Sequence, residues 1–307
     1  MRPTQICHAD WGGAANKRWL ARATLGADGR YTAHAPALIG DHVDLIPSIR
    51  RSIGDVGCAL VGFDFPVGIP ASYATLAGIT AFKPFLRELG KGEWTEFYNV
   101  ARVPSDISVH RPFYPFRPGQ TRQAHLLSAL RLDDIDDLRR ECERKQPGRR
   151  AACPLFWTLG ANQVGKGAIV GWRDVLVPAL DNSEDAILWA FDGRLHDLLQ
   201  AGKIVIVETY PGECYRWFLP KPLIGKGKQE VRKAVGCHLT KWAASLDLSL
   251  EPTLLCTIEK GFPEGDDAFD AIVGLFGMIE VVTGRRQPGE PSEDRIRNVE
   301  GWILGQV

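Results

Sequence analysis

Three acidic residues of this chain each follow a short apolar run, at the point where the run ends. They are Asp10, Asp64 and Glu208, and the runs before them have the length and composition of buried strands. Glycines after Asp10 and a proline after Asp64 let the backbone turn away there. Because the carboxyl ends of neighbouring parallel strands meet at one edge of a sheet, we expect these three carboxylates to lie close together.

A further acidic group, D-D-A-F-D-A at residues 266–271, opens the last long apolar stretch. Residues three or four apart share a helix face, so Asp266, Asp267 and Asp270 lie on one side of the expected helix. Helix capping and the helix dipole are the ordinary explanation for Asp266 and Asp267, as pairing with an arginine or with loop amides is for Glu208 alone. Neither explains Asp270, one turn inside an apolar helix.

Carboxylates gathered in this way repel one another unless a cation lies among them. Oxygen ligands suit Mg²⁺ or Mn²⁺, and the sequence has no His/Cys cluster that would indicate zinc. We therefore predict a divalent-metal site with Asp10, Asp64, Asp267 and Asp270 as ligands and Glu208 as a further catalytic acid. His8, beside Asp10, is predicted to be a packed core histidine.

Elements that would position these acids can be read from the hydrophobic pattern. A hairpin with its turn at Asp28-Gly29, a helix at 41–53 and the strand before Asp64 fit a mixed sheet with helices on both faces. Further predicted elements are helices at 183–200, 229–246 and 266–282 and a strand at 253–258.

The middle of the chain breaks this rhythm, because it is rich in aromatic residues and proline. We predict a core formed by 1–70 and 183–307, the latter with a C-terminal tail, and an insertion at 71–182 that caps the acidic edge. Long connections of this kind are usually functional.

Composition favours an ordinary globular protein, with 45% hydrophobic and 24% charged residues among 307. No apolar run is long enough to span a membrane, and no signal-like segment opens the chain, so we expect the cytoplasm. The seven cysteines form no C-x-x-C pair, as in a reducing compartment. Net charge is zero, so nucleic acid would be attracted only by local basic patches.

Basic residues that could contact phosphate are Lys226, Lys228 and Arg232 in the basic stretch 221–241, and Lys166 in a Gly-Lys loop. Solvated surface is the ordinary explanation for each basic run taken separately. The full P-loop spacing is absent around Lys166. We predict these four residues as substrate contacts.

Several motifs together resemble the DUF429 family of predicted RNase H-like (RuvC-like) nucleases, over nearly the whole chain. They are A-D-W-G-G, F-D-F-P-V-G-I-P, F-W-T-L-G-A-N-Q-V-G-K, V-E-T-Y-P-G-E, D-D-A-F-D-A and E-G-W-I-L-G. The resemblance implies an RNase H-like mixed sheet, β-β-β-α-β-α-β-α, with a large insertion after the fourth strand. It places Asp10 on the first strand, Asp64 on the fourth, Glu208 on the fifth, and Asp267 and Asp270 on the last helix.

The chemistry that this resemblance implies is hydrolysis of nucleic-acid phosphodiester bonds by two Mg²⁺ or Mn²⁺ ions that share Asp10. Many nucleases of this fold carry Glu where Asp64 stands, and the shorter Asp changes the metal spacing.

Two other classes stay open. D-W-G-G also resembles the first phosphate loop of actin-like and sugar-kinase phosphotransferases, but these need a duplicated domain, and the later Asp192-Gly193 falls in a predicted helix. A non-catalytic module that binds one structural cation or a basic partner is the third class. A nuclease should bind Mn²⁺ without nucleotide, whereas Mg-ATP should stabilise a kinase against heat.

Overall fold

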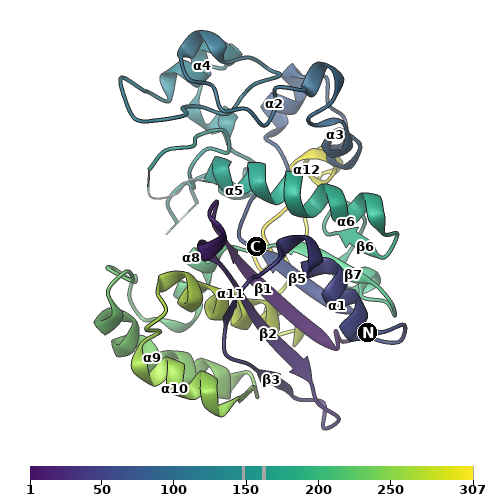
Figure 1. Ribbon diagram of the computed structural model, residues 1–307, viewed down its shortest axis with the longest axis vertical. Helices are drawn as coiled ribbons and strands as arrows, with labels where there is room; N and C mark the ends of the chain where they lie inside the picture. Colours follow the sequence, from purple (N-terminus) through teal and green to yellow (C-terminus); the bar gives the residue numbers. More distant parts are fainter. Residues whose placement is uncertain (147–148, 161–163, 307) are drawn as a thin grey trace. The chain divides into compact units, whose positions relative to one another are not determined.

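The computed structural model describes residues 1–146, 149–160 and 164–306 (Figure 1). The chain divides into two compact units: unit 1 contains 1–64, 182–289 and 303–307, and unit 2 contains 65–181 and 290–302. All strands in the described ranges belong to unit 1. The sequence-based division assigns 1–70 and 183–307 to an RNase H-like core and 71–182 to a cap over it. These assignments stay a prediction.

Unit 1 is built on one mixed sheet, which confirms the predicted mixed α/β class. The strand order is β6-β7-β5-β1-β2-β3-β8, with β4 paired to β2. The strand β2 runs antiparallel to β1, β3 and β4, whereas β1, β5, β7 and β6 are mutually parallel, as are β3 and β8. The strands are β1 Gln5–Trp11, β2 Arg18–Leu25, β3 Tyr31–Ala33, β4 Ala37–Leu38, β5 Ala59–Phe63, β6 Ala186–Leu188, β7 Ile204–Glu208 and β8 Ser249–Leu250.

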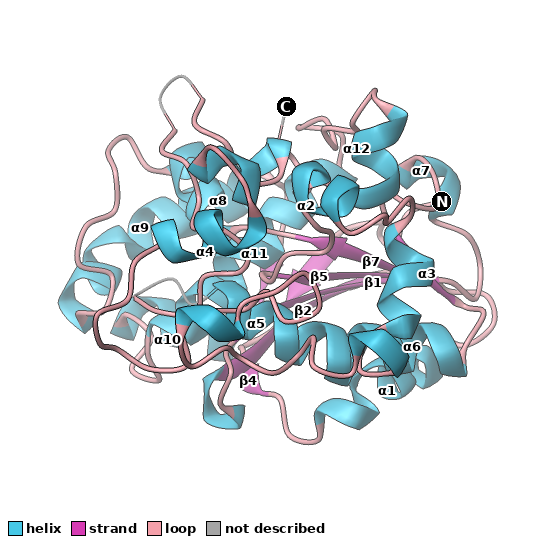
Figure 2. Cartoon of the chain, turned by 90° about the horizontal axis from the view of Figure 1, so that it is seen from above, coloured by secondary structure: helices cyan, strands magenta, loops and turns pink. Residues whose placement is uncertain are grey.

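Helices cover both faces of this sheet (Figure 2). Side chains alternate along β1, so Gln5 and His8 face opposite ways. The Ser52 hydroxyl of α1 donates to the Gln5 side chain at 2.5 Å, and His8 bonds the Ala271 carbonyl of α11. The helices of unit 1 are α1 Leu45–Ile53, α7 Leu195–Leu198, α8 Pro211–Phe218, α9 Gln229–Ser245, α10 Pro252–Lys260 and α11 Asp266–Val282, with 3₁₀ turns at Ala15–Lys17 and His42–Asp44.

Unit 2 is helical and has its own aromatic core. Phe97 contacts the rings of Phe85, Phe113 and Trp172. Its helices are α2 Ala71–Leu76, α3 Phe82–Glu88, α4 Ala124–Leu130, α5 Val164–Gly171, a π-helical turn Trp172–Leu176 leading into α6 Val177–Asn182, and α12 Asp294–Val299, with 3₁₀ turns at Gly92–Trp94, Pro104–Asp106, Ile135–Leu138 and Glu141–Glu143. Among the helices of both units, as far as the chain is described, none is long and apolar enough to cross a membrane.

Two predicted elements are wrong. The helix expected at 183–200 is instead strand β6, followed by a turn and the short helix α7. Its apolar run pairs with β7, and the Asp192 carboxylate accepts the Leu188 N–H at 2.8 Å, so the backbone is satisfied outside a helix. The Asp192-Gly193 pair therefore lies in a turn after a strand. However, the described part of unit 2 contains no copy of the sheet that a kinase would need.

The strand expected at 253–258 is the helix α10. Pro252 occupies the first helical turn, where its missing N–H costs nothing, and Gly261 ends the helix in the left-handed conformation. Pro252 and Gly261 thus mark the two ends of a helix. They decide the conformation of this segment, although the short apolar run between them would also suit a strand. The predicted hairpin and the helices near 45–53, 229–245 and 266–282 are confirmed.

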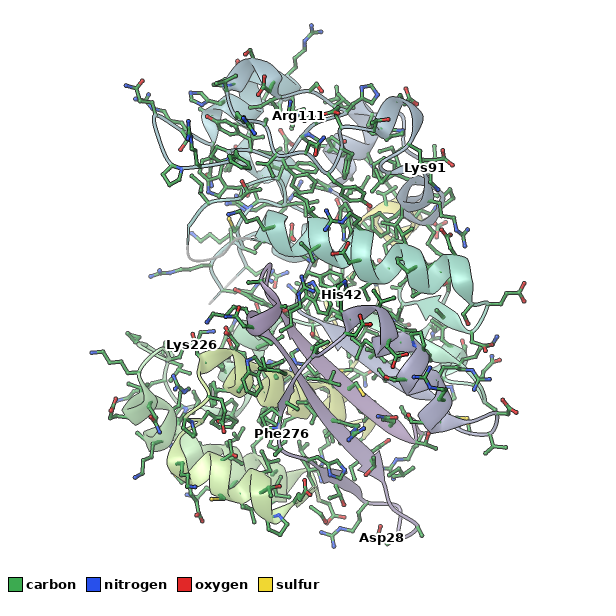
Figure 3. The ribbon with its side chains drawn as sticks, viewed as in Figure 1. Asp28, His42, Lys91, Arg111, Lys226 and Phe276 are labelled. Carbon is green, nitrogen blue, oxygen red and sulfur yellow. The ribbon has the colours of Figure 1, made fainter. Side chains whose placement is uncertain are left out.

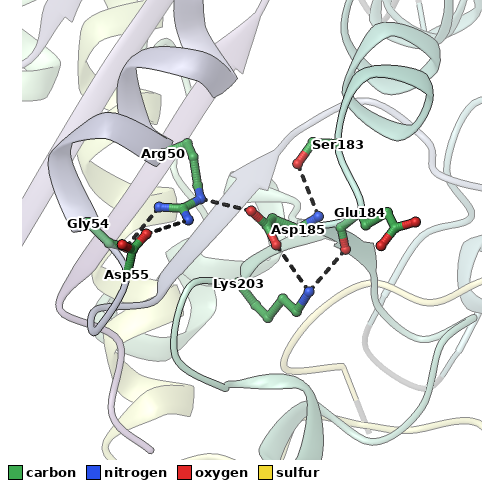
Figure 4. A network of polar contacts seen from close by, with 7 residues as sticks. All are labelled: Arg50, Gly54, Asp55, Ser183, Glu184, Asp185 and Lys203. Carbon is green, nitrogen blue, oxygen red and sulfur yellow. Dashed lines mark hydrogen bonds and ion pairs between the residues drawn. The ribbon is translucent and has the colours of Figure 1, made fainter.

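A polar network joins α1 to the amino ends of β6 and β7 (Figure 4). Arg50 Nε donates to Asp185 at 2.9 Å, and its Nη2 donates to Asp55 at 3.0 Å. Lys203 Nζ reaches the other Asp185 oxygen at 3.1 Å. Hydrogen bonds from Arg50 and then Lys203 lower the pKa of Asp185. This network lies at the amino ends of the strands, whereas the predicted acids lie at the opposite, carboxyl ends. The network therefore does not involve the candidate site.

The packing of α11 on the sheet depends on a glycine. A Cβ built at Gly274 would overlap the ring of His8 on β1. Only a residue without a side chain lets the helix come this close to the strand.

We predict that Gly274→Ala lowers the free energy of unfolding by about 1–3 kcal/mol, because the added methyl overpacks the contact with His8. Intrinsic helix propensity alone would make the Ala variant more stable by about 1 kcal/mol. A loss of stability would therefore show that the contact with His8 outweighs helix propensity. Urea unfolding measures the change. Gly40→Ala is the control, since its Cβ would meet nothing within 4 Å. Equal stability of the two variants would contradict the prediction.

Candidate functional site

Asp10 and Asp64 lie next to each other at the carboxyl ends of β1 and β5. The parallel register pairs Ala9 with Phe63, so the two acids that follow are level and on the same face. Their carboxyl groups share a hydrogen bond, and the Trp11 N–H donates to Asp64 Oδ1 at 2.6 Å. Asp10 is only 8% exposed.

His8 fixes α11 over this face. Its Nδ1 bonds the Ala271 carbonyl at 3.0 Å, and its Nε2 bonds the Thr209 hydroxyl at 2.8 Å. A carbonyl only accepts, so Nδ1 carries the proton and the Thr209 hydroxyl donates to Nε2. Burial lowers the pKa of His8 to about 4. The predicted core histidine is thus confirmed as a fully buried, neutral link between β1, β7 and α11.

The helix α11 brings Asp267 and Asp270 toward the strand acids. Asp270 is 6% exposed; its Oδ1 accepts from the Tyr215 hydroxyl, and its Oδ2 pairs with the Lys226 ammonium. Asp267 Oδ2 pairs with the exposed Lys17 at 2.9 Å. We call Asp10, Asp64, Asp267 and Asp270 the acidic cluster. Asp266, predicted as the cap, is the first helical residue, and Gly265 precedes the helix.

Electrostatic repulsion within the acidic cluster is strong. Burial, followed by the charges of Asp64, Asp270 and Asp267, raises the pKa of Asp10 well above its ordinary value. Burial likewise raises the pKa of Asp64 to about 6, although the Trp11 N–H opposes the shift. For Asp270, burial also raises the pKa, against the opposing effect of Lys226. The cluster therefore disfavours full ionisation.

Glu208 is not brought together with these acids. The register pairs Gly62 with Val207 and Phe63 with Glu208. Side chains alternate along a strand, so Glu208 faces the side of the sheet covered by α1, opposite to Asp10 and Asp64. The next residue, Thr209, which directly follows β7, lies on the His8 side of the sheet.

The predicted phosphate contacts have different surroundings. Lys226 reaches into the acidic cluster, and Lys228 is exposed at the start of α9. Arg232 is 3% exposed and donates to three backbone carbonyls, so its predicted role as a surface phosphate contact is wrong. Lys166 lies on α5 in unit 2, where its role stays a prediction; residues 161–163 of its motif are outside the described ranges.

The oxygen donors suit a hard divalent cation, but they are not arranged to hold one. Over the described residues, no group of three or more His, Cys, Asp or Glu side chains could ligate a metal ion as it lies. Both oxygens of Asp270 already have partners, and the Asp10 and Asp64 carboxyls bond each other. The donor chemistry fits the predicted metal, whereas the present geometry does not.

Sequence reasoning missed three groups at this site: Thr209, Tyr215 and Lys17. Thr209 and Tyr215 follow β7, and Lys17 lies in the turn between β1 and β2. Only the register and the α8 helix bring them to the acids, so no local pattern identifies them.

Known proteins do not identify the chain further: no protein-family model, curated protein or solved structure matches it. The DUF429 resemblance therefore rests on the motifs alone.

We predict that Asp10→Asn stabilises the metal-free protein by about 1–2 kcal/mol near neutral pH, because it removes a buried carboxyl whose ionisation in the folded state is penalised by burial and by the neighbouring acids. A raised folded-state pKa means that protonated Asp10 contributes stability below its ordinary pKa of 3.8, and that this is lost as the pH rises through the raised value. The advantage of the variant should therefore shrink as the pH falls. Urea unfolding at several pH values, in chelator, measures it.

The control for this comparison is Asp133→Asn, at an exposed position in unit 2. It should change stability by less than about 0.5 kcal/mol throughout. A destabilised Asp10→Asn would show that the charge is needed by the fold.

We also predict that His8 remains the neutral Nδ1–H tautomer near neutral pH and titrates at about 4. Nitrogen-detected NMR of the imidazole rings measures this directly. His196, whose side chain is 93% exposed, is the internal reference for a solvated ring. A His8 ring that takes up a proton near neutral pH would contradict the buried link.

Proposed function

We propose that unit 1 is a divalent-cation-dependent nuclease that hydrolyses phosphodiester bonds of nucleic acid, with the acidic cluster as ligands for Mg²⁺ or Mn²⁺. The observation that carries this proposal is the burial of Asp10 beside Asp64, with Asp270 close enough to raise the pKa of Asp10 further. Like charges held together in this way destabilise a fold, and functional sites are where they concentrate. The motif resemblance supports a nuclease rather than a simple cation site.

The sheet supports an RNase H-like core as part of the same proposal. Antiparallel strands β1, β2 and β3 are followed by α1 and then by β5, which lies parallel to β1. The acids lie on the first strand, after the strand that follows α1, and on the last long helix. The sheet also contains the strands β6 and β8, which the predicted β-β-β-α-β-α-β-α order does not include.

A bound divalent cation would supply Lewis-acid activation of water and stabilisation of the leaving oxygen. The side chains of this protein would hold the cation, and Lys226 and Lys228 would contact the phosphate backbone. Because the acids do not form an ion-binding group as they lie, some of their present partners must first be displaced. We also propose a cytoplasmic location, and a role for residues 71–182 as a cap over the acidic edge.

The test is cleavage of labelled single-stranded DNA, duplex DNA, RNA, RNA–DNA hybrid and branched DNA in Mn²⁺ or Mg²⁺. We expect cleavage of at least one substrate, abolished by chelator and reduced at least 100-fold in Asp10→Asn and Asp64→Asn, since both remove a charged ligand. Glu208→Gln should retain activity, because the register places Glu208 on the other face.

Asp133→Asn is again the matched control, an exposed acid far along the sequence from the cluster. Cleavage that survives Asp10→Asn undiminished would indicate a contaminant. Absence of cation-dependent cleavage of every substrate would contradict the proposed function.

A further inference from the structure

Lys226 lies where a cation at Asp270 would have to bind. Its ammonium pairs with Asp270 Oδ2, while the Tyr215 hydroxyl donates to Oδ1, so both oxygens of this buried carboxylate are engaged. The ammonium also lies 5.8 Å from the centre of the Tyr215 ring. Burial, the largest single influence, lowers the pKa of Lys226, but the charge and hydrogen bond of Asp270, together with the charges of Asp10 and Asp266, raise it overall.

The backbone of the loop that carries Lys226 is held in place by a buried arginine. Figure 3 labels Lys226 on the segment before α9. On α9 itself, Arg232 Nη1 donates to the Lys226 carbonyl at 2.6 Å. The same guanidinium donates to the carbonyls of Gly261 at 3.1 Å and Phe262 at 2.9 Å, in the turn before α11. A buried arginine thus ties the backbone of Lys226 to the helix that carries Asp270.

This anchoring distinguishes Lys226 from a surface lysine. Lys228, two residues later, is exposed, whereas the Lys226 side chain is 38% exposed and paired with a carboxylate that is 9% exposed. Ion pairs held in a partly desolvated setting are screened less by solvent than those on the surface. The Lys226 ammonium is therefore a fixed positive charge inside the acidic cluster.

We propose that Lys226 is a tethered counter-cation, which occupies the acidic cluster in the metal-free protein and must leave Asp270 before a divalent cation can bind there. This inference rests on the proposed metal site and explains why the described acids form no ion-binding group as they lie. An ammonium and a divalent ion repel each other at a shared carboxylate, so they compete.

Displacement also gives the ammonium a new role. Once it leaves Asp270, Lys226 is a free cation next to the acids, and a phosphate group of nucleic acid is its natural partner. Each binding event then favours the other, so substrate and cation bind with positive coupling. The cation alone is expected to bind weakly.

The test is calorimetric titration of Mn²⁺, without nucleic acid, into the full chain and its variants. Lys226→Met removes the charge but keeps the length of the side chain, and it should bind Mn²⁺ at least tenfold more tightly than wild type. Lys241→Met, which removes an exposed lysine of α9, is the matched control and should bind within twofold of wild type. Adding Asp10→Asn to Lys226→Met should abolish the gain, which would locate the ion in the acidic cluster.

Unchanged or weaker binding by Lys226→Met overturns the inference, as does a gain that survives Asp10→Asn. Lys226→Arg keeps the charge and should bind no more tightly than wild type; a tenfold gain there would also overturn it. It further separates loss of charge from loss of fold, which thermal unfolding of each variant monitors. If no variant binds Mn²⁺, the inference fails, and the cleavage assay decides the proposed function independently.

Discussion

The buried ring of His8 is the constraint on which the candidate site depends. It joins a strand from the first residues of the chain to a helix near its end, and its second nitrogen is bonded to Thr209 just after β7. Since both ring nitrogens have fixed partners and the ring is fully buried, the helix has one register on the sheet. That register sets which α11 residues face Asp10. Gly274 contributes by leaving room for the ring.

This register explains how a repulsive group of acids is kept in a folded protein. Asp270 on its own would be an unpaired carboxylate in an apolar helix, which folds tolerate poorly. The structure compensates with the Lys226 ammonium and the Tyr215 hydroxyl, and with a hydrogen bond between Asp10 and Asp64. Each of these stabilising contacts is a local polar interaction, so another polar or charged partner can replace it. A purely structural ion pair would not need so many acids.

The sequence predicted the parts of the fold that depend on local patterns. The hairpin turn at Asp28-Gly29, the acids at strand ends and the position of Asp270 all follow from residue spacing. Long-range pairing decided the rest. The run after Ser183 has helix-compatible residues, yet it pairs with β7, and Glu208 faces away because of a register that no single strand encodes.

Arg232 shows the same limit for charged residues. Within its basic stretch it resembles its lysine neighbours, and only the tertiary structure reveals that its donors are bonded to backbone carbonyls of two other segments. Burial of a guanidinium cannot be read from composition, because the carbonyls that accept its hydrogen bonds come from elsewhere in the chain.

The link between His8 and Ala271 spans 263 positions of sequence. During synthesis the ribosome releases β1 and its acid long before the helix that completes the cluster. The nascent chain therefore holds Asp10 without Asp270 and Lys226 for most of its elongation, and long-range contacts of this kind form late. Any activity of the acidic cluster would thus be confined to chains whose translation has passed α11, so unfinished fragments would be inert.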